Sequence, residues 1–231
     1  MKHLSFFLVI SSLVILACTS VTSNKTEDFS SYFYPITGKD TTVFVFSDSR
    51  ENKISLIVYQ KSDTELVKIT CGIIEESKEI GFSKKDKVIK DSTNVIIQGI
   101  SLSGHTTYTD SVLKYPRYNL TEFKDTLVKT QNSFFGPMKV EMFFSWKLKQ
   151  KTNVDVLGKT TPALVLEQRM EIYQTIQGQR MSSLDSKKEM TYAKNFGLVK
   201  LNNLTEGYTY KLIAKTNLPQ ARKDIKQGKR W

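Results

Sequence analysis

Apolar and polar residues alternate along residues 140–148, and this pattern constrains the fold more than any other part of the sequence. One face of the run carries Val140, Met142, Phe144, Trp146 and Leu148. The other face carries Glu141, Ser145 and Lys147, with Phe143 as the exception. Successive side chains of a strand point to opposite faces of the sheet, so a period of two predicts a half-buried strand.

A longer run, residues 164–176, repeats this alternation less strictly. One face holds Leu164, Leu166, Met170, Ile172 and Ile176 together with Gln168 and Gln174. These 13 residues make a long strand. A strand of that length predicts a curved or bulged sheet.

Shorter β-rich runs complete the series, at residues 42–46, 54–59, 66–74, 94–102, 188–201 and 208–214. We expect the first two to form a hairpin and residues 203–207 to form a turn. Gly197, between Phe196 and Leu198, predicts a bulge or bend within a strand. Residues 76–93 contain five lysines and four acidic residues, which predicts an exposed connection.

At most one or two short helices are expected. Asn119-Leu120-Thr121-Glu122 resembles a capping box, and apolar residues follow at helical spacing, although strand pieces remain the alternative there. Residues 219–229 are the second candidate. The sequence therefore predicts a mainly β protein with a single antiparallel domain, built as a long curved sheet or half-barrel. A β-sandwich is the alternative architecture.

The N-terminus has the organisation of an export signal. Met1-Lys2-His3 precedes an apolar stretch, residues 4–16, that would span roughly 20 Å as a helix, less than the ~30 Å core of a membrane. This length favours a signal peptide over a permanent span. Leu13-Val14-Ile15-Leu16-Ala17-Cys18 resembles the lipobox of bacterial lipoproteins. The resemblance implies cleavage before Cys18, diacylation of its thiol and acylation of the new amino group. An ordinary signal peptide that contains a cysteine is the alternative.

These features divide the chain into four parts. We expect a lipoprotein signal peptide at 1–17, a lipidated flexible tether at 18–33, a β-rich domain at 34–218 and a basic tail at 219–231. Thr19 follows the cysteine, and by analogy with Gram-negative sorting this favours the outer membrane. The chain has two cysteines. Lipid on Cys18 would leave Cys71 without an intrachain partner, and we expect Cys71 to be a buried, inert thiol.

The chain is strongly basic, with a formal net charge of +11. In an exported protein this charge points away from nucleic acid and toward anionic lipid headgroups, lipopolysaccharide phosphates or an acidic protein. The tail concentrates it in Arg222, Lys223, Lys226, Lys229 and Arg230, and ends in Trp231. Two interpretations stay open, a solvated terminus without fixed structure and a contact with a membrane or partner.

Two segments resemble uncharacterised envelope lipoproteins of Bacteroidota. Residues 32–38 (YFYPITG) are similar to their aromatic-Pro-aliphatic-x-x-Gly opening, but lack one spacer residue and the tryptophan that usually follows. Residues 191–200 (TYAKNFGLVK) are close to their recurring YAKGVGLVK segment. The resemblance implies an envelope location and a β-rich fold, in some members related to lipoprotein-carrier-like half-barrels. It supplies no catalytic residues.

The sequence offers little catalytic chemistry. His105 is the one histidine after the signal peptide, so a histidine-based zinc site or a Ser/His/Asp triad would depend on it. Ser103 stands where a nucleophile elbow requires glycine. We identify no catalytic residues, metal ligands or cofactor motifs, and expect a protein that is not an enzyme. A hydrolase is the remote alternative.

The aromatic residues give the remaining functional hint. Phe134, Phe135, Phe144 and Trp146 are candidates to line an apolar cavity, with ordinary core packing as the alternative. We therefore expect a membrane-anchored envelope lipoprotein that binds a lipid or another apolar ligand. A structural, accessory or inhibitor lipoprotein with a protein partner is the alternative. The sequence does not specify an oligomeric state.

Overall fold

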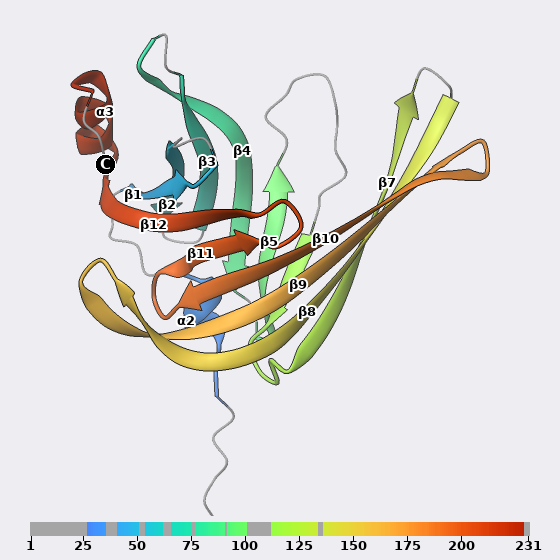
Figure 1. Cartoon of the computed structure of the whole chain (residues 1–231), viewed down its shortest axis with the longest axis horizontal. Coiled ribbons are helices and arrows are strands. Elements are labelled where there is room, and N and C mark those ends of the chain that lie inside the picture. Colours follow the sequence, from blue (N-terminus) through green and yellow to red (C-terminus); the bar gives the residue numbers. More distant parts are fainter. Residues whose placement is uncertain are drawn as a thin grey trace, which may run out of the picture.

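The computed structural model describes residues 27–35, 41–50, 54–61, 66–74, 77–90, 92–100, 112–133 and 136–228. Its described part contains twelve strands and two helices (Figure 1). The strands are β1 (Thr42–Asp48), β2 (Ile54–Lys61), β3 (Leu66–Ile74), β4 (Glu79–Lys90), β5 (Asn94–Ile100), β6 (Val112–Pro116), β7 (Glu122–Ser133), β8 (Gly136–Val156), β9 (Lys159–Ile176), β10 (Gln179–Ala193), β11 (Gly197–Asn203) and β12 (Tyr208–Asn217). The helices are α2 (Ser30–Phe33) and α3 (Leu218–Lys226).

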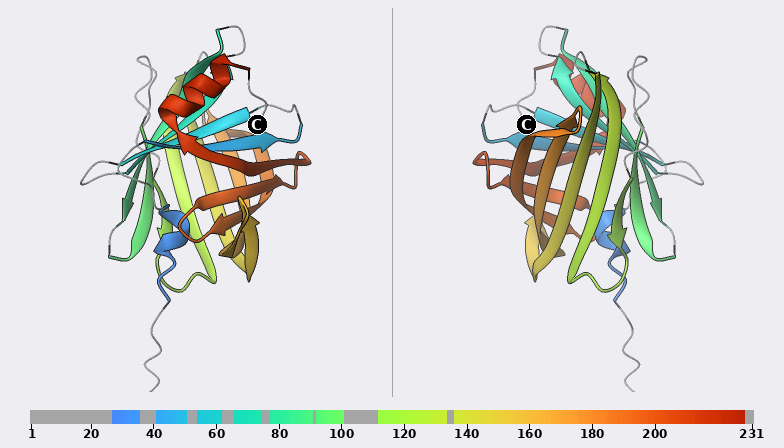
Figure 2. Two further views of the ribbon diagram at one scale, coloured as in Figure 1. Left: turned by 90° about the vertical axis from the view of Figure 1, so that its left-hand side faces the viewer. Right: turned by 90° about the vertical axis from the view of Figure 1, so that its right-hand side faces the viewer.

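All twelve strands belong to one antiparallel sheet that is nearly closed into a barrel (Figure 2). Their order is β6-β5-β4-β3-β2-β1-β12-β11-β10-β9-β8-β7. The edge strands β6 and β7 come together, and the Lys114 amide of β6 donates to Asp125 Oδ2 of β7 at 3.2 Å. The predicted single antiparallel, half-barrel-like fold is confirmed, and the sandwich alternative is not adopted.

The longest strands form an arm beyond the barrel. β8 has 21 residues, β9 has 18 and β10 has 15. Two-residue turns at Leu157-Gly158 and Gln177-Gly178 join them, and all four residues have positive φ, which suits the twist of a tight hairpin. We call residues 124–133, 136–145, 169–176 and 179–187 the arm. Figure 1 shows these strand ends reaching away from the barrel.

The barrel wall has an apolar core on each face near β1. Phe44 and Phe46 belong to the inner core, whereas Val43 and Val45 pack outside with Ala221 and Ile225 of α3. Both faces of β1 are therefore covered. This explains why its residues 42–46 are all buried and do not alternate in polarity. The expected C-terminal helix is confirmed as α3.

The N-terminal segment is part of the fold from residue 28 onward. Phe29, Tyr32 and Phe33, which the sequence division placed in the tether, are 5–7% exposed and lie in the inner core. Asp28 forms an ion pair with Arg117, and the hydrogen bond from that guanidinium holds the pKa of the Asp28 carboxyl well below its usual range. The polar composition of the preceding residues suggested a tether up to residue 33, but the aromatic rings at its end are buried in the barrel.

Two local predictions were wrong. The expected helix at 119–127 is not formed; residues 120–121 form a turn and β7 begins at Glu122, so the strand alternative is adopted, with φ of 57° at Asn119 and Leu120 buried. The expected exposed connection at 76–93 contains β4, whose Val88 and Asp86 are buried in the barrel wall. In both segments pairing with distant strands overrides the local preference.

The expected bend at Gly197 is a hairpin turn between β10 and β11. Gly197 has φ of 75°, and a Cβ added there would lie 3.6 Å from Pro35 Cδ. The Asn195 amide also donates to the Ser31 carbonyl oxygen at 2.7 Å. The positive φ favours glycine at this position.

Phe33→Ala is expected to lower the free energy of unfolding by about 3–5 kcal/mol, because it removes a buried ring. Urea denaturation followed by tryptophan fluorescence measures this. Leu204→Ala, in a turn and 51% exposed, is the control and should change stability by less than about 0.5 kcal/mol. Equal changes in the two variants would contradict the packing of α2 inside the barrel.

Cys71 is expected to be unreactive in the folded protein. It is 2% exposed under α3, and burial raises the pKa of its thiol to about 11. In a Cys18→Ser chain, a disulfide reagent at about pH 8 should titrate no thiol in buffer and one in concentrated guanidinium. Rapid reaction of the folded chain would contradict the position of α3 over Cys71.

Candidate functional site

Aromatic side chains fill the described interior of the barrel at its α2 end. Trp146 of β8 is 1% exposed and stacks on Phe123 of β7, with ring centroids 4.8 Å apart and planes 7° apart. Phe144 stacks against the same indole at 5.5 Å, and Tyr115 of β6 meets it edge-on at 5.7 Å. This end of the barrel is packed core.

Two tyrosines add a polar centre to this core. Phe33 of α2 stacks on Tyr115 at 4.7 Å and meets Tyr192 edge-on at 5.0 Å. The two phenol oxygens lie 3.3 Å apart. Burial raises the pKa of Tyr115 and raises that of Tyr192 far above the usual value. Both phenols therefore stay protonated at neutral pH and act as hydrogen-bonding groups.

A charged pair lies on the inner face of β3 and β4. Lys68 Nζ is 3.9 Å from Asp86 Oδ2, and Asp86 is 1% exposed. Burial raises the pKa of the nearby Tyr59 phenol, and the negative charge of Asp86 raises it further. Removing one partner of such a pair would leave the other charge buried without a counter-charge, which is strongly destabilising. The pair therefore helps to hold β3 against β4.

An apolar strip continues along part of the inner face of the arm beyond the packed core. Cross-strand pairs continue outward from Trp146 as Phe144 with Met170, then Met142 with Ile172, and Ile172 with Leu184. Exposure rises along this path from 1% at Trp146 to 55% at Leu184. We call Met142, Phe144, Met170, Ile172 and Leu184 the arm face.

The outer face of the same strands is largely charged. Arg169 pairs with Asp185 at 2.7 Å, and Lys187 pairs with Glu167 at 3.2 Å. Phe143, the exception in the sequence pattern, lies on this outer face and is 38% exposed. The alternation of the sequence therefore describes the two faces of the arm correctly.

The structure brings together two of the four aromatic residues expected to line an apolar site. Phe144 and Trp146 are in contact, whereas Phe134 and Phe135 lie outside the residues whose side chains are described. Leu184 was missed because residues 179–187 show no clear alternation. A register shift between Arg180 and Ser182 breaks the pattern, and the Gln177-Gly178 turn was the available signal.

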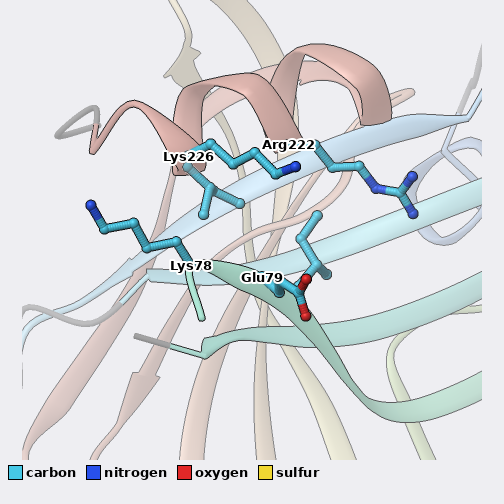
Figure 3. Close-up of a pocket in the computed structure, with 6 residues that line it drawn as sticks. Lys78, Glu79, Arg222 and Lys226 are labelled. Carbon is cyan, nitrogen blue, oxygen red and sulfur yellow. The ribbon is translucent and has the colours of Figure 1, made fainter. Parts of the chain in front are cut away.

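A basic groove lies between α3 and the turn that precedes β4. Its volume is about 320 Å³, and its lining residues are Lys78, Glu79, Ile80, Arg222, Ile225 and Lys226 (Figure 3). Of the expected tail contacts, Arg222, Lys223 and Lys226 are exposed on α3; Lys229, Arg230 and Trp231 lie outside the described residues. Lys78 was not identified from the sequence as part of this site, because it lies in a turn that is far from α3 in the sequence.

The basic groove and the start of the described chain lie at opposite ends of the barrel. Figures 1 and 2 show α2 at one end and α3 at the other. The groove therefore opens away from the point at which the N-terminal segment enters the fold.

The described residues do not form a recognisable catalytic or metal centre. No group of three His, Cys, Asp or Glu side chains lies close enough among them to hold a metal ion. His105 lies outside the described residues. None of the described helices is long and apolar enough to cross a membrane.

Comparison with known proteins shows similarity at the level of the fold. No family model matches the sequence, and no curated protein is significantly similar to it. A crystal structure of a candidate lipoprotein from Parabacteroides distasonis matches with a TM-score of 0.51 at 10% sequence identity. The match covers 83% of this chain and 100% of that chain. The chain therefore shares its overall fold with that protein.

Proposed function

We propose that this protein is a lipoprotein of the bacterial envelope that binds a lipid or another apolar ligand on its arm face. Acylated Cys18 anchors it in the membrane, with the outer membrane as the expected location. The role is binding rather than catalysis. An accessory or inhibitory role toward a protein partner is the alternative.

Two observations support the anchor. The sequence around Cys18 resembles a lipobox, and the fold is shared with a candidate lipoprotein of Parabacteroides distasonis. Cys18 also precedes residue 28, the first partly buried residue, by ten positions. An extended segment of that length reaches about 35 Å, which would hold the barrel clear of the lipid surface.

The partial exposure of the arm face supports the proposal that it binds an apolar ligand. Five apolar side chains share one sheet face; four of them are half-buried next to the buried Trp146, and Leu184 is 55% exposed. A ligand laid on this face would extend the core outward. Each methylene group that it buried would contribute about 0.8 kcal/mol, so an acyl chain suits a strip of this kind.

Cys18→Ser is expected to abolish incorporation of labelled palmitate and to move the protein from the detergent phase to the aqueous phase in a cloud-point separation. Loss of the acyl chains removes the membrane anchor. Cys71→Ala is the control and should retain both the label and the partitioning. Persistent labelling of the Cys18→Ser chain would contradict lipidation at this residue.

A brominated fatty acid is expected to quench Trp146 fluorescence in a Trp231→Phe chain, because the arm face begins at the Trp146–Phe144 stack. Leu184→Asp should weaken this binding by at least about tenfold, since it places a charge on the apolar strip.

Val128→Asp is the matched control, because Val128 is 47% exposed on the outer face of the same arm. This variant should bind within about twofold of the unsubstituted chain. The proposed ligand site would be wrong if the fatty acid did not quench Trp146, or if the two aspartate variants lost affinity equally.

A further inference from the structure

We propose that the basic groove between α3 and β4 is a docking site for an acidic segment of a partner protein. The site combines a charged rim with an apolar floor. Arg222 and Lys226 come from α3, and Lys78 comes from the turn before β4 (Figure 3). Ile80 and Ile225 form the floor.

The three cations of the groove have no carboxylate partner in the described part of the chain. Within the described part of the chain, Lys78, Arg222 and Lys226 are exposed and take part in none of the ion pairs. On the arm, by contrast, Arg169 and Lys187 each pair with a carboxylate of a neighbouring strand. The groove therefore holds positive charge that is available to a ligand.

Helix stability explains only part of this charge. Lys223 and Lys226 lie in the last turn of α3, where cations interact favourably with the helix dipole. Arg222 lies earlier in the helix and Lys78 lies outside it, so the dipole accounts for neither. Both residues line the groove.

The geometry fits a carboxylate-bearing chain. Arg222 and Lys226 are four residues apart and so project from neighbouring positions on one helix face. A guanidinium binds a carboxylate with two parallel hydrogen bonds, and Lys226 would bind a second carboxylate one helical turn away. An aliphatic side chain of the same segment would cover Ile80 and Ile225.

Glu79 favours a protein segment over an anionic membrane surface. Glu79 lines the groove together with the three cations, and a protein segment can place a neutral or basic residue opposite its carboxylate, which a uniformly negative lipid surface cannot do. The position of α3 agrees with this choice, because the groove lies at the end of the barrel away from α2. This second argument rests on the proposed anchor at Cys18.

Binding of a short fluorescein-labelled peptide of alternating glutamate and leucine tests the site, with fluorescence anisotropy as the readout. The protein is the exported Cys18→Ser chain, so the result does not depend on lipidation or on the arm face. The peptide should bind, and its affinity should fall as salt rises. A peptide with glutamine in place of glutamate should bind at least tenfold more weakly.

Two double variants with the same change in net charge separate the groove from the overall charge of the protein. Arg222→Glu with Lys226→Glu should weaken peptide binding by at least tenfold. Lys159→Glu with Lys194→Glu should leave it within twofold; both residues are exposed, the first at the start of β9 and the second in the turn between β10 and β11. Equal losses in the two variants, or no binding of the peptide at low salt, would overturn the proposal.

Vesicles of phosphatidylglycerol provide the remaining comparison. The unsubstituted chain should bind them more weakly than the peptide, and the groove variant should change vesicle binding no more than the control variant does. Tight vesicle binding that is lost only in the groove variant would overturn the proposal in favour of a membrane contact. Neither result depends on palmitate labelling or on fatty-acid quenching. The docking site at the groove and the proposed lipoprotein function can therefore be contradicted independently.

Discussion

The structure depends on the burial of Phe33 against Tyr115 and Tyr192. These residues come from α2, β6 and β10, and Trp146 of β8 extends the same cluster. A large sheet with two free edges exposes unpaired backbone groups unless those edges are paired or covered. The aromatic cluster draws the two ends of the sheet around a common centre, and β6 then meets β7 through the Lys114–Asp125 hydrogen bond. Closure of the barrel and packing of the N-terminal segment therefore involve the same aromatic cluster.

The segments around Pro35 and Gly197 meet in this region. Pro35 of the first packs on Gly197 of the second, and Ser31 accepts a hydrogen bond from Asn195. The tight β10–β11 turn provides the space into which the chain after α2 passes. An alanine at Gly197 would add strain at positive φ. The motif YAKNFGLVK thus has a structural explanation that requires no ligand.

The sequence predicts the arm better than it predicts the barrel around α2. Alternation over residues 140–148 and 164–176 reports which side chains face inward, because each strand there has one apolar and one charged face. It fails at residues 42–46, where α3 covers the second face, and at Asp86, whose buried charge is balanced by Lys68 on another strand. The same limit applies to the candidate sites. Phe144 and Trp146 lie two residues apart in one strand, so the sequence pattern places them on the same face. Lys78 and Arg222 are far apart in the sequence, and only the packing of α3 beside β4 brings them into one groove.

The packed end of the barrel separates the proposed sites from the proposed anchor. Phe33, Tyr115 and Trp146 occupy the end at which the chain enters, so a ligand has no space in the described interior there. The arm face and the basic groove lie on strands and a helix that extend away from that end (Figure 1). An apolar ligand would thus meet the protein on an open strip, where burial is incomplete and release is rapid, instead of in a closed cavity. Recognition of an acidic partner at α3 would place that partner beside β1 to β4, on the opposite part of the sheet order from the arm strands β7 to β10.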